Sequence, residues 1–252
     1  MKYLKFLFLF LLAFTSFAPN LTKEVNIKTS SSVSFSQKIE AVYNSIDSNN
    51  FNMPNLESFS KALQGYYLLK EDGKVKNDFL TIIDFSMSSR EKRCWVIDVD
   101  QNKIIYNSLV AHGQNSGEDY AQQFSNRNNS YQSCLGFFTT GEIYSGKHGM
   151  SMKLDGLEKG INDNARQRSI VVHGADYVSN SFIRNHSRLG RSQGCPAVSS
   201  KLSGKVIDVI SDKTVLFINS TNQNYNSKYL DATLAANVAL NQQTDVLASN
   251  FD

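Results

Sequence analysis

The amino-acid sequence predicts a mainly β fold, a β-sandwich or barrel preceded by a small helical segment. After residue 76, seven short runs rich in β-branched and aromatic residues follow one another, separated by clusters of Gly, Asn, Asp and Ser. Few windows between these runs show helical spacing. This pattern favours a mainly antiparallel sheet over a parallel α/β arrangement.

The N-terminus of the chain has the pattern of an export signal. Two lysines precede the apolar run of residues 6–14, and the small residues Ser16 and Ala18 follow it. The run is too short to cross a bilayer comfortably, so residues 1–18 are predicted to be a secretory signal peptide. An uncleaved N-terminal anchor is the alternative. After signal removal we expect no transmembrane domain.

Residues 19–75 are expected to form a small helical N-terminal segment that packs on the following domain. A short amphipathic helix is predicted near residues 36–48. In residues 56–67, Leu, Phe and Tyr recur at helical spacing, and Asn52 or Asn55 can cap this second helix.

Residues 76–220 contain the expected β domain. Its strand-like runs are, in chain order, DFLTIIDF, CWVIDV, KIIYNSLVA, GFFTTGEIY, GMSMKL, SIVVHG and TVLFIN. SKLSGKVIDVISD is a candidate helix before the last strand. Residues 221–252 form a polar tail rich in Asn and Gln, with a weak helical pattern in residues 230–240.

Composition and charge are those of an ordinary globular protein. The chain is 41% hydrophobic and 19% charged, with a net charge of +3 that becomes +1 when Lys2 and Lys5 leave with the signal. This charge is too small for a nucleic-acid-binding surface, so no nucleic-acid partner is expected. We expect a monomer.

The three cysteines occur in different settings. An odd number leaves at least one thiol unpaired in an exported protein. Cys94 and Cys134 lie in strand-like surroundings that suit small buried thiols, and a disulfide, if present, is expected to join these two. Cys195 instead lies between Gly194 and Pro196, in a tight turn that presents its sulfur.

A base for a nucleophilic cysteine stands upstream. A catalytic thiol needs a base, a group that orients the base, and donors for the developing oxyanion. His173 ends a buried strand-like run, and the following Gly174 can offer a backbone carbonyl to the imidazole. The amides of Gly194 and Cys195 can point together at an oxyanion. These four residues are the candidate catalytic residues.

The segments HGADYVSNSFI and RLGRSQGCPAV resemble the murein L,D-transpeptidase catalytic domain family, the YkuD-like group, in its RSQGCPA branch. Upstream blocks such as LTIIDFSMSSREKRCWVIDV resemble it too, and the resemblance covers about residues 54–219. It implies a β-rich fold, a nucleophile at Cys195, and a base at His173 with Gly174 as its backbone partner. The implied reaction is acyl transfer on peptidoglycan stem peptides, in a bacterial periplasm or cell envelope.

Two positions depart from the commoner form of the motif. Gln193 replaces a histidine, and Ala197 stands where an arginine would follow. We therefore expect His173 to be the only base, and Gln193 to hold the Cys195 loop through neutral hydrogen bonds.

Nearby arginines can replace the missing one, because guanidinium groups suit the carboxylates of a stem peptide. The predicted substrate-binding residues are Ser192, Gln193, Arg191 and Arg188.

Three alternatives stay open at this point. L,D-carboxypeptidase or endopeptidase activity would use the same acyl-enzyme with water as acceptor. A zinc hydrolase would need His112, His148 and His173, although no HExxH motif or close ligand pair is present. A non-enzymatic β-sandwich wall-binding module would bury an inert thiol. The expected enzyme needs no metal or cofactor.

Overall fold

The computed structural model describes residues 35–221 and 224–235. The predicted signal peptide and much of the predicted tail lie outside the described residues. Residues 35–45 form a helix. The labelled helices are α2 (Leu56–Glu71), α3 (Asn180–His186), α4 (Ser200–Ile210) and the 3-10 turn η1 (Lys228–Leu230), and residues 232–235 are also helical. No helix in the described part of the chain is both long enough and apolar enough to cross a membrane.

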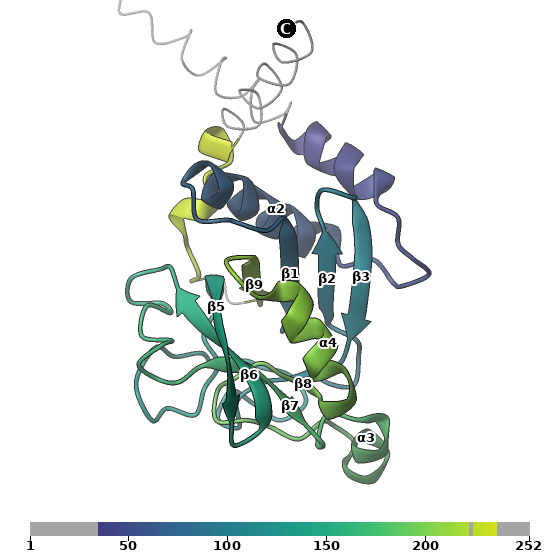
Figure 1. Cartoon of the computed structure of the whole chain (residues 1–252), viewed down its shortest axis with the longest axis vertical. Helices are drawn as coiled ribbons and strands as arrows, with labels where there is room; N and C mark the ends of the chain where they lie inside the picture. The colour runs from purple at the N-terminus through teal and green to yellow at the C-terminus, as the bar shows by residue number, and fades with distance from the viewer. Residues whose placement is uncertain (1–34, 222–223, 236–252) are drawn as a thin grey trace, which may run out of the picture.

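The strands of the described residues form one mixed sheet that curls into a nearly closed barrel (Figure 1). The order is β3-β2-β1-β9-β5-β6-β7-β8-β4. Among these named strands, β1–β9 and β7–β8 pair in parallel and the other pairs are antiparallel, which confirms the predicted mainly antiparallel β fold. The strands are β1 (Phe79–Asp84), β2 (Cys94–Asp98), β3 (Lys103–Ser108), β4 (Val110–Ala111), β5 (Gly136–Gly146), β6 (Gly149–Gly156), β7 (Val171–Ala175), β8 (Ala197–Ser199) and β9 (Val215–Asn219).

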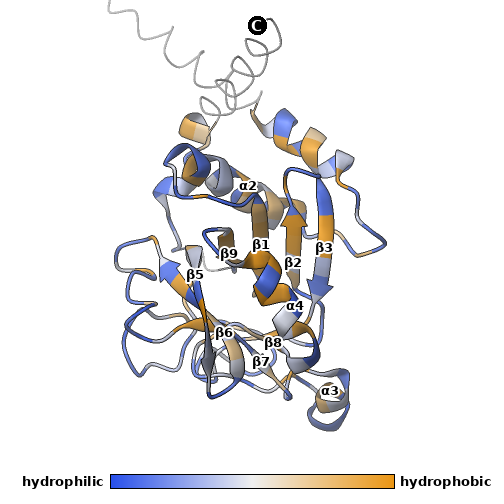
Figure 2. Cartoon of the chain, viewed as in Figure 1, coloured by the Kyte–Doolittle hydropathy of each residue, from blue (hydrophilic) through white to orange (hydrophobic). Residues whose placement is uncertain are grey.

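The central strands are covered on both faces, which explains their nearly continuous apolar sequences. In β9, Leu216 and Ile218 pack into one buried cluster, whereas Val215 and Phe217 pack into another on the opposite face. This is the alternation of side chains that a strand requires. Figure 2 shows the result as hydrophobic colouring along β1, β2 and β9, with hydrophilic loops around them.

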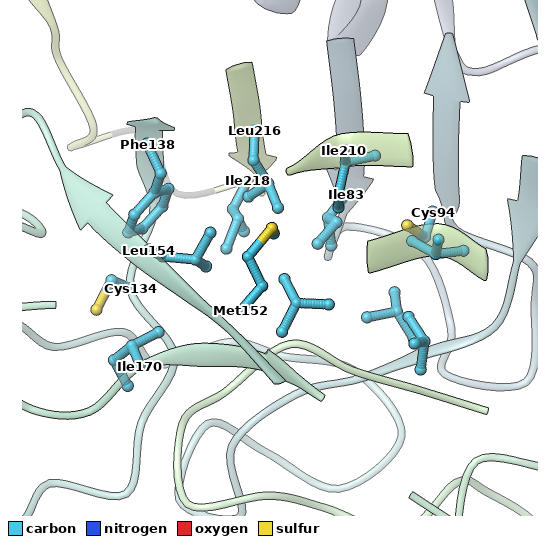
Figure 3. Close-up of a cluster of buried hydrophobic side chains, with 14 of the residues drawn as sticks. Ile83, Cys94, Cys134, Phe138, Met152, Leu154, Ile170, Ile210, Leu216 and Ile218 are labelled. Atoms are coloured by element: carbon cyan, nitrogen blue, oxygen red, sulfur yellow. The ribbon is translucent and has the colours of Figure 1, made fainter. Parts of the chain in front are cut away.

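The first cluster lies between the curled sheet and α4. It includes Phe138, Met152 and Leu154 from β5 and β6, and Ile210 from α4 (Figure 3). The predicted helix after residue 200 is confirmed, and its apolar side closes this cluster. α4 also packs against β7, the strand that carries His173.

Cys94 and Cys134 belong to the same cluster as free, buried thiols, so no disulfide joins them. Burial raises the pKa of Cys94 to about 12 and that of Cys134 to about 11. Both thiols therefore stay protonated at neutral pH, in agreement with the expected role of small buried side chains.

The second cluster joins the N-terminal helices and part of the C-terminal segment to the sheet. Phe59 and Leu63 of α2 pack here with Phe217, and Asn55 caps α2 by accepting a hydrogen bond from the Glu57 amide at 2.8 Å. Tyr229, within the predicted polar tail, is buried in this cluster. The helical segment is thus packed on the sheet as expected.

Candidate active site

β7 places His173 where it can act as a base. The residue is 3% exposed and pairs with Ser151 of β6 and Ala197 of β8. Its Nδ1 lies 2.9 Å from the Gly174 carbonyl oxygen. Since a carbonyl only accepts, Nδ1 carries the proton, and Nε2 keeps a free lone pair. The predicted backbone partner of His173 is therefore in place.

Gly174 is required by the helix that packs on β7. A Cβ at this position would lie 2.6 Å from Ser203 Oγ and 3.1 Å from Ser200 Cα, both in α4. Only glycine lets α4 approach β7 this closely, and this approach keeps the Gly174 carbonyl beside the imidazole.

Cys195 lies in the loop that leads into β8. Because β7 and β8 pair in parallel with His173 opposite Ala197, Cys195 arrives two residues before that register position. Its half-buried thiol donates to the Ser169 carbonyl oxygen at 3.5 Å, and it lines the same pocket as His173. The structure therefore brings the predicted nucleophile and base into one pocket.

Ser192 shapes the nucleophile loop. Its hydroxyl accepts a hydrogen bond from the Gly194 amide at 3.0 Å and donates to the Cys195 carbonyl at 2.7 Å. The expectation that the Gly194 amide faces an oxyanion is thus wrong in this conformation, because that N–H is already used. Gly194 has a φ of +120°, a conformation that residues with a Cβ rarely adopt, which explains why this position is a glycine. The Cys195 amide remains the candidate oxyanion donor.

Gln193 does not hold the loop as the sequence predicted. Its side chain is exposed at the pocket, and no hydrogen bond to it is found within the described residues. The neutral hydrogen bonds expected of Gln193 are made by Ser192, because the turn directs the Ser192 side chain inward and the Gln193 side chain outward.

The two arginines predicted to bind substrate are tied to a neighbouring loop. Arg191 lines the pocket, but it pairs with Glu118 at 2.7 Å and donates to the Gln114 carbonyl. Arg188 pairs with Glu118 at 2.9 Å and does not line the pocket, so the structure gives no support to its predicted contact with substrate. Glu118, far away in sequence, decides both orientations.

The pocket has a volume of about 660 Å³ and draws residues from several loops. The β5–β6 hairpin contributes Tyr144, Lys147 and His148, and the loop before β5 contributes Tyr131. The His148 ring stacks on His173 with centroids 4.4 Å apart and an interplanar angle of 25°. The sequence analysis missed these pocket roles. A pattern of neighbouring residues could not reveal these roles, because the hairpin lies beside His173 and Cys195 only after the chain has folded.

Arg168 is another pocket residue that the sequence analysis missed, five positions before His173. The only signal available was its place inside the upstream block GINDNARQRSIVVHGADY, part of the region of resemblance.

Electrostatics favour a neutral resting pair. Burial lowers the pKa of His173, the His148 ring lowers it further, and the bond to the Gly174 carbonyl opposes the shift. Burial raises the pKa of the Cys195 thiol, against the opposing effects of the Val171 amide and the Arg168 charge. A neutral imidazole beside a protonated thiol is the starting state for general-base activation.

The three histidines of the zinc alternative do not come together. His112 is buried elsewhere, where its Nδ1 lies 2.8 Å from Arg93 Nη2. In the ranges that the structure describes, no group of three or more His, Cys, Asp or Glu residues is arranged to hold a metal ion.

Several solved structures are similar to this chain at low identity. They are the helical cell shape determining protein Pgp2 of Campylobacter jejuni (15% identity, TM-score 0.41, 71% of this chain and 62% of that chain), an L,D-transpeptidase of Xylanimonas cellulosilytica (14%, 0.32, 54% and 58%) and an L,D-transpeptidase of Mycobacterium smegmatis (10%, 0.34, 57% and 69%). The chain spans about six tenths of the length of the first two. No curated protein matches it.

The family model of the L,D-transpeptidase catalytic domain matches residues 51–219. This match contains the sheet, α2 and the pocket with Cys195 and His173. Because it covers more than half of the sequence, the chain belongs to the L,D-transpeptidase catalytic domain family.

Proposed function

We propose that the protein is an exported cysteine acyltransferase, an L,D-transpeptidase, that acts on peptidoglycan stem peptides through a thioester at Cys195. The observation that carries the proposal is one pocket that holds Cys195 together with a buried His173 whose Nδ1 is bound to the Gly174 carbonyl. Membership of the L,D-transpeptidase family supports the substrate class.

The reaction begins when His173 Nε2 takes the proton of the Cys195 thiol and the sulfur attacks the carbonyl carbon of the bond between an L-centre and a D-residue. The Cys195 amide stabilises the oxyanion of the tetrahedral intermediate. Collapse breaks the C–N bond, and His173 returns its proton to the leaving amine. The acyl group stays on sulfur as a thioester.

In the second half of the reaction an acceptor attacks the thioester. A stem-peptide amine gives a cross-link, and His173 takes the proton that the amine loses before returning it to the Cys195 sulfur. Water in the same position gives the carboxypeptidase or endopeptidase reaction. These activities differ in the acceptor and leaving group and share the acyl-enzyme.

The charges that line the pocket suit a carboxylate-bearing peptide. Lys147 and Arg168 contribute positive charges, Glu118 offsets that of Arg191, and no aspartate or glutamate is among the described lining residues. A field of this sign concentrates an anionic substrate at the pocket. The predicted signal peptide supports a location in the bacterial periplasm or cell envelope, where we propose that the enzyme acts as a monomer.

The test is incubation of the purified protein with muropeptides of defined stem length, with products identified by mass. The proposal expects cross-linked dimers from the wild type and no turnover from Cys195→Ala. Cys94→Ala is the matched control, since it removes a buried thiol outside the pocket and should retain activity. Trimmed monomers without dimers would assign the hydrolytic alternative. Activity in Cys195→Ala, or a native Cys195 that resists thiol reagents and turns over no muropeptide, would refute the enzyme and favour a wall-binding module.

A further inference from the structure

The pocket contains a cation that has no anionic partner. Arg191 pairs with Glu118, and Lys147 lies exposed on the β5–β6 hairpin. Arg168 is half-buried, and no carboxylate of the described residues forms an ion pair with it. Removing a charge from water without an opposite charge is unfavourable, so the position of Arg168 needs an explanation.

The Arg168 guanidinium is held rigidly by neutral acceptors. Nη1 donates to the Ser125 carbonyl at 2.5 Å and to Cys134 Sγ at 2.6 Å. Nη2 donates to the Gln132 carbonyl at 2.7 Å and to Ser130 Oγ at 3.1 Å. All of the Nη hydrogens are therefore used, and the group cannot grip a substrate carboxylate with both nitrogens without breaking these bonds.

Arg168 lies directly against the nucleophile loop. A Cβ placed on Gly194 would be 3.4 Å from Arg168 Nη2 and 2.7 Å from the Gln132 carbonyl that Nη2 binds. On the other side, the Cys195 thiol contacts the carbonyl of Ser169, the residue after Arg168. The fixed charge thus lies beside Gly194, the residue before the nucleophile, and Ser169 contacts the Cys195 thiol.

In the resting pocket the Arg168 guanidinium has no anionic partner. The proposed reaction creates an anion near it, the Cys195 thiolate. We infer that Arg168 is a positioning residue for the proposed reaction, whose fixed positive charge stabilises the anion formed at Cys195. Its hydrogen bonds also hold residues 125–134 as one wall of the pocket. The inference rests on the proposed function of Cys195, and it predicts that the charge and the wall contacts have separable effects.

The test measures the rate of alkylation by iodoacetamide as a function of pH. Cys94 and Cys134 are buried, so the signal reports Cys195, which Cys195→Ala verifies by its loss. Arg168→Gln should move the midpoint of the profile upward by about one pH unit, the usual scale for losing a nearby opposite charge. Arg168→Lys keeps a charge at the same site and should show a smaller shift than Arg168→Gln. Equal midpoints for wild type and Arg168→Gln, or equal shifts in Gln and Lys variants, would overturn the inference.

A second pair of variants keeps Arg168 and changes the net charge around it. Ser130→Asp places a carboxylate next to Arg168 Nη2, and Ser130→Asn places a neutral group of the same shape there. The midpoint should rise in the Asp variant and stay within about 0.3 pH units of wild type in the Asn variant. If Arg168→Gln does not fold, the two Ser130 variants test the inference in its place. Equal midpoints of their alkylation profiles would then overturn it. Because alkylation needs no muropeptide, its outcome is independent of the substrate test.

Discussion

At the scale of single residues, Ser192 carries the contacts that set the geometry of the nucleophile. Its side chain connects the Gly194 amide to the Cys195 carbonyl, and its own amide donates to the His112 carbonyl at 2.9 Å. Gln193, next to it, makes no comparable contact in the described structure. The two neighbours should therefore differ sharply when each is truncated.

We expect Ser192→Ala to lower kcat/KM by roughly tenfold, since a small misplacement of the thiolate is costly. Gln193→Ala should stay within about twofold of the wild type, because its side chain has no partner to lose. His173→Ala should cost roughly a hundredfold or more, the usual scale for a general base. Steady-state kinetics on one muropeptide compares them. A larger loss from Gln193→Ala than from Ser192→Ala would show that position 193 contacts substrate.

His112 contacts the same loop, because its carbonyl accepts the hydrogen bond from the Ser192 amide. Its buried imidazole should make the stability of the protein depend on pH. Burial, and then the Arg93 charge, lower its pKa to about 4. The unfolded chain, with a pKa of about 6.5, binds the proton first, so stability present above pH 6.5 is lost as the pH falls towards 4. Between pH 7 and pH 4.5 this group should remove about 2 kcal/mol from the free energy of unfolding.

The measurement is urea unfolding of the wild type and His112→Gln at both pH values. The glutamine keeps an acceptor for Arg93 and a donor for the Gly117 carbonyl but does not titrate. The free energy of unfolding should therefore decrease less between pH 7 and pH 4.5 in the variant than in the wild type. Equal decreases would assign the pH dependence to other groups.

At the scale of elements, two helical glycines show how packing outweighs helix propensity. Gly65 of α2 faces β5, where an added Cβ would lie 2.1 Å from the Phe137 ring. Gly204 of α4 faces open space, with nothing within 4 Å of an added Cβ. Both lie inside helices, so alanine offers the same gain in propensity at each.

Gly204→Ala should stabilise the protein by about 0.5–1 kcal/mol, because it removes backbone entropy from the unfolded state. Gly65→Ala should destabilise it by about 1–3 kcal/mol, because α2 must move away from the sheet. Denaturant unfolding of both variants measures the difference. If both substitutions stabilised the protein, α2 would not be packed against β5 as the structure shows.

At the scale of the whole molecule, the C-terminal segment completes the second cluster. Tyr229 is 3% exposed, lies 5.5 Å from the Phe137 ring by centroids, and receives a hydrogen bond from Lys74 at 3.1 Å. It therefore contacts the barrel and the turn after α2, and the η1 turn that carries it packs against α2. Because the central strands belong to both clusters, these parts should unfold together.

Tyr229→Ala should lower the free energy of unfolding by about 3 kcal/mol, as for other large buried aromatic side chains. Leu234→Ala is the matched control, because Leu234 is 52% exposed and should change it by no more than about 0.5 kcal/mol. Thermal unfolding followed by near-UV and far-UV circular dichroism should give one coincident transition in the wild type. A separate early transition of the helices would contradict this cooperativity.

Local patterns were sufficient for the elements and residues that depend on neighbours in sequence. The apolar runs predicted the long strands, because alternating side chains with both faces buried leave a continuous signature. His173 with Gly174, and Cys195 in its glycine turn, were predicted as site residues from their immediate neighbours in the chain. β8 and α3 were missed, because three and seven residues are too short to show a period.

Tertiary structure decided what depends on contacts between distant segments. It inserted β9 between β1 and β5, and it brought the β5–β6 hairpin over His173. It also tied Arg188 and Arg191 to Glu118, and left Arg168 as the charge beside the nucleophile loop. The sequence by itself determined the candidate pair of Cys195 and His173, because the backbone groups that orient them are adjacent in the chain. The surrounding charges were decided by the fold, because a guanidinium takes its role from partners that only folding brings near.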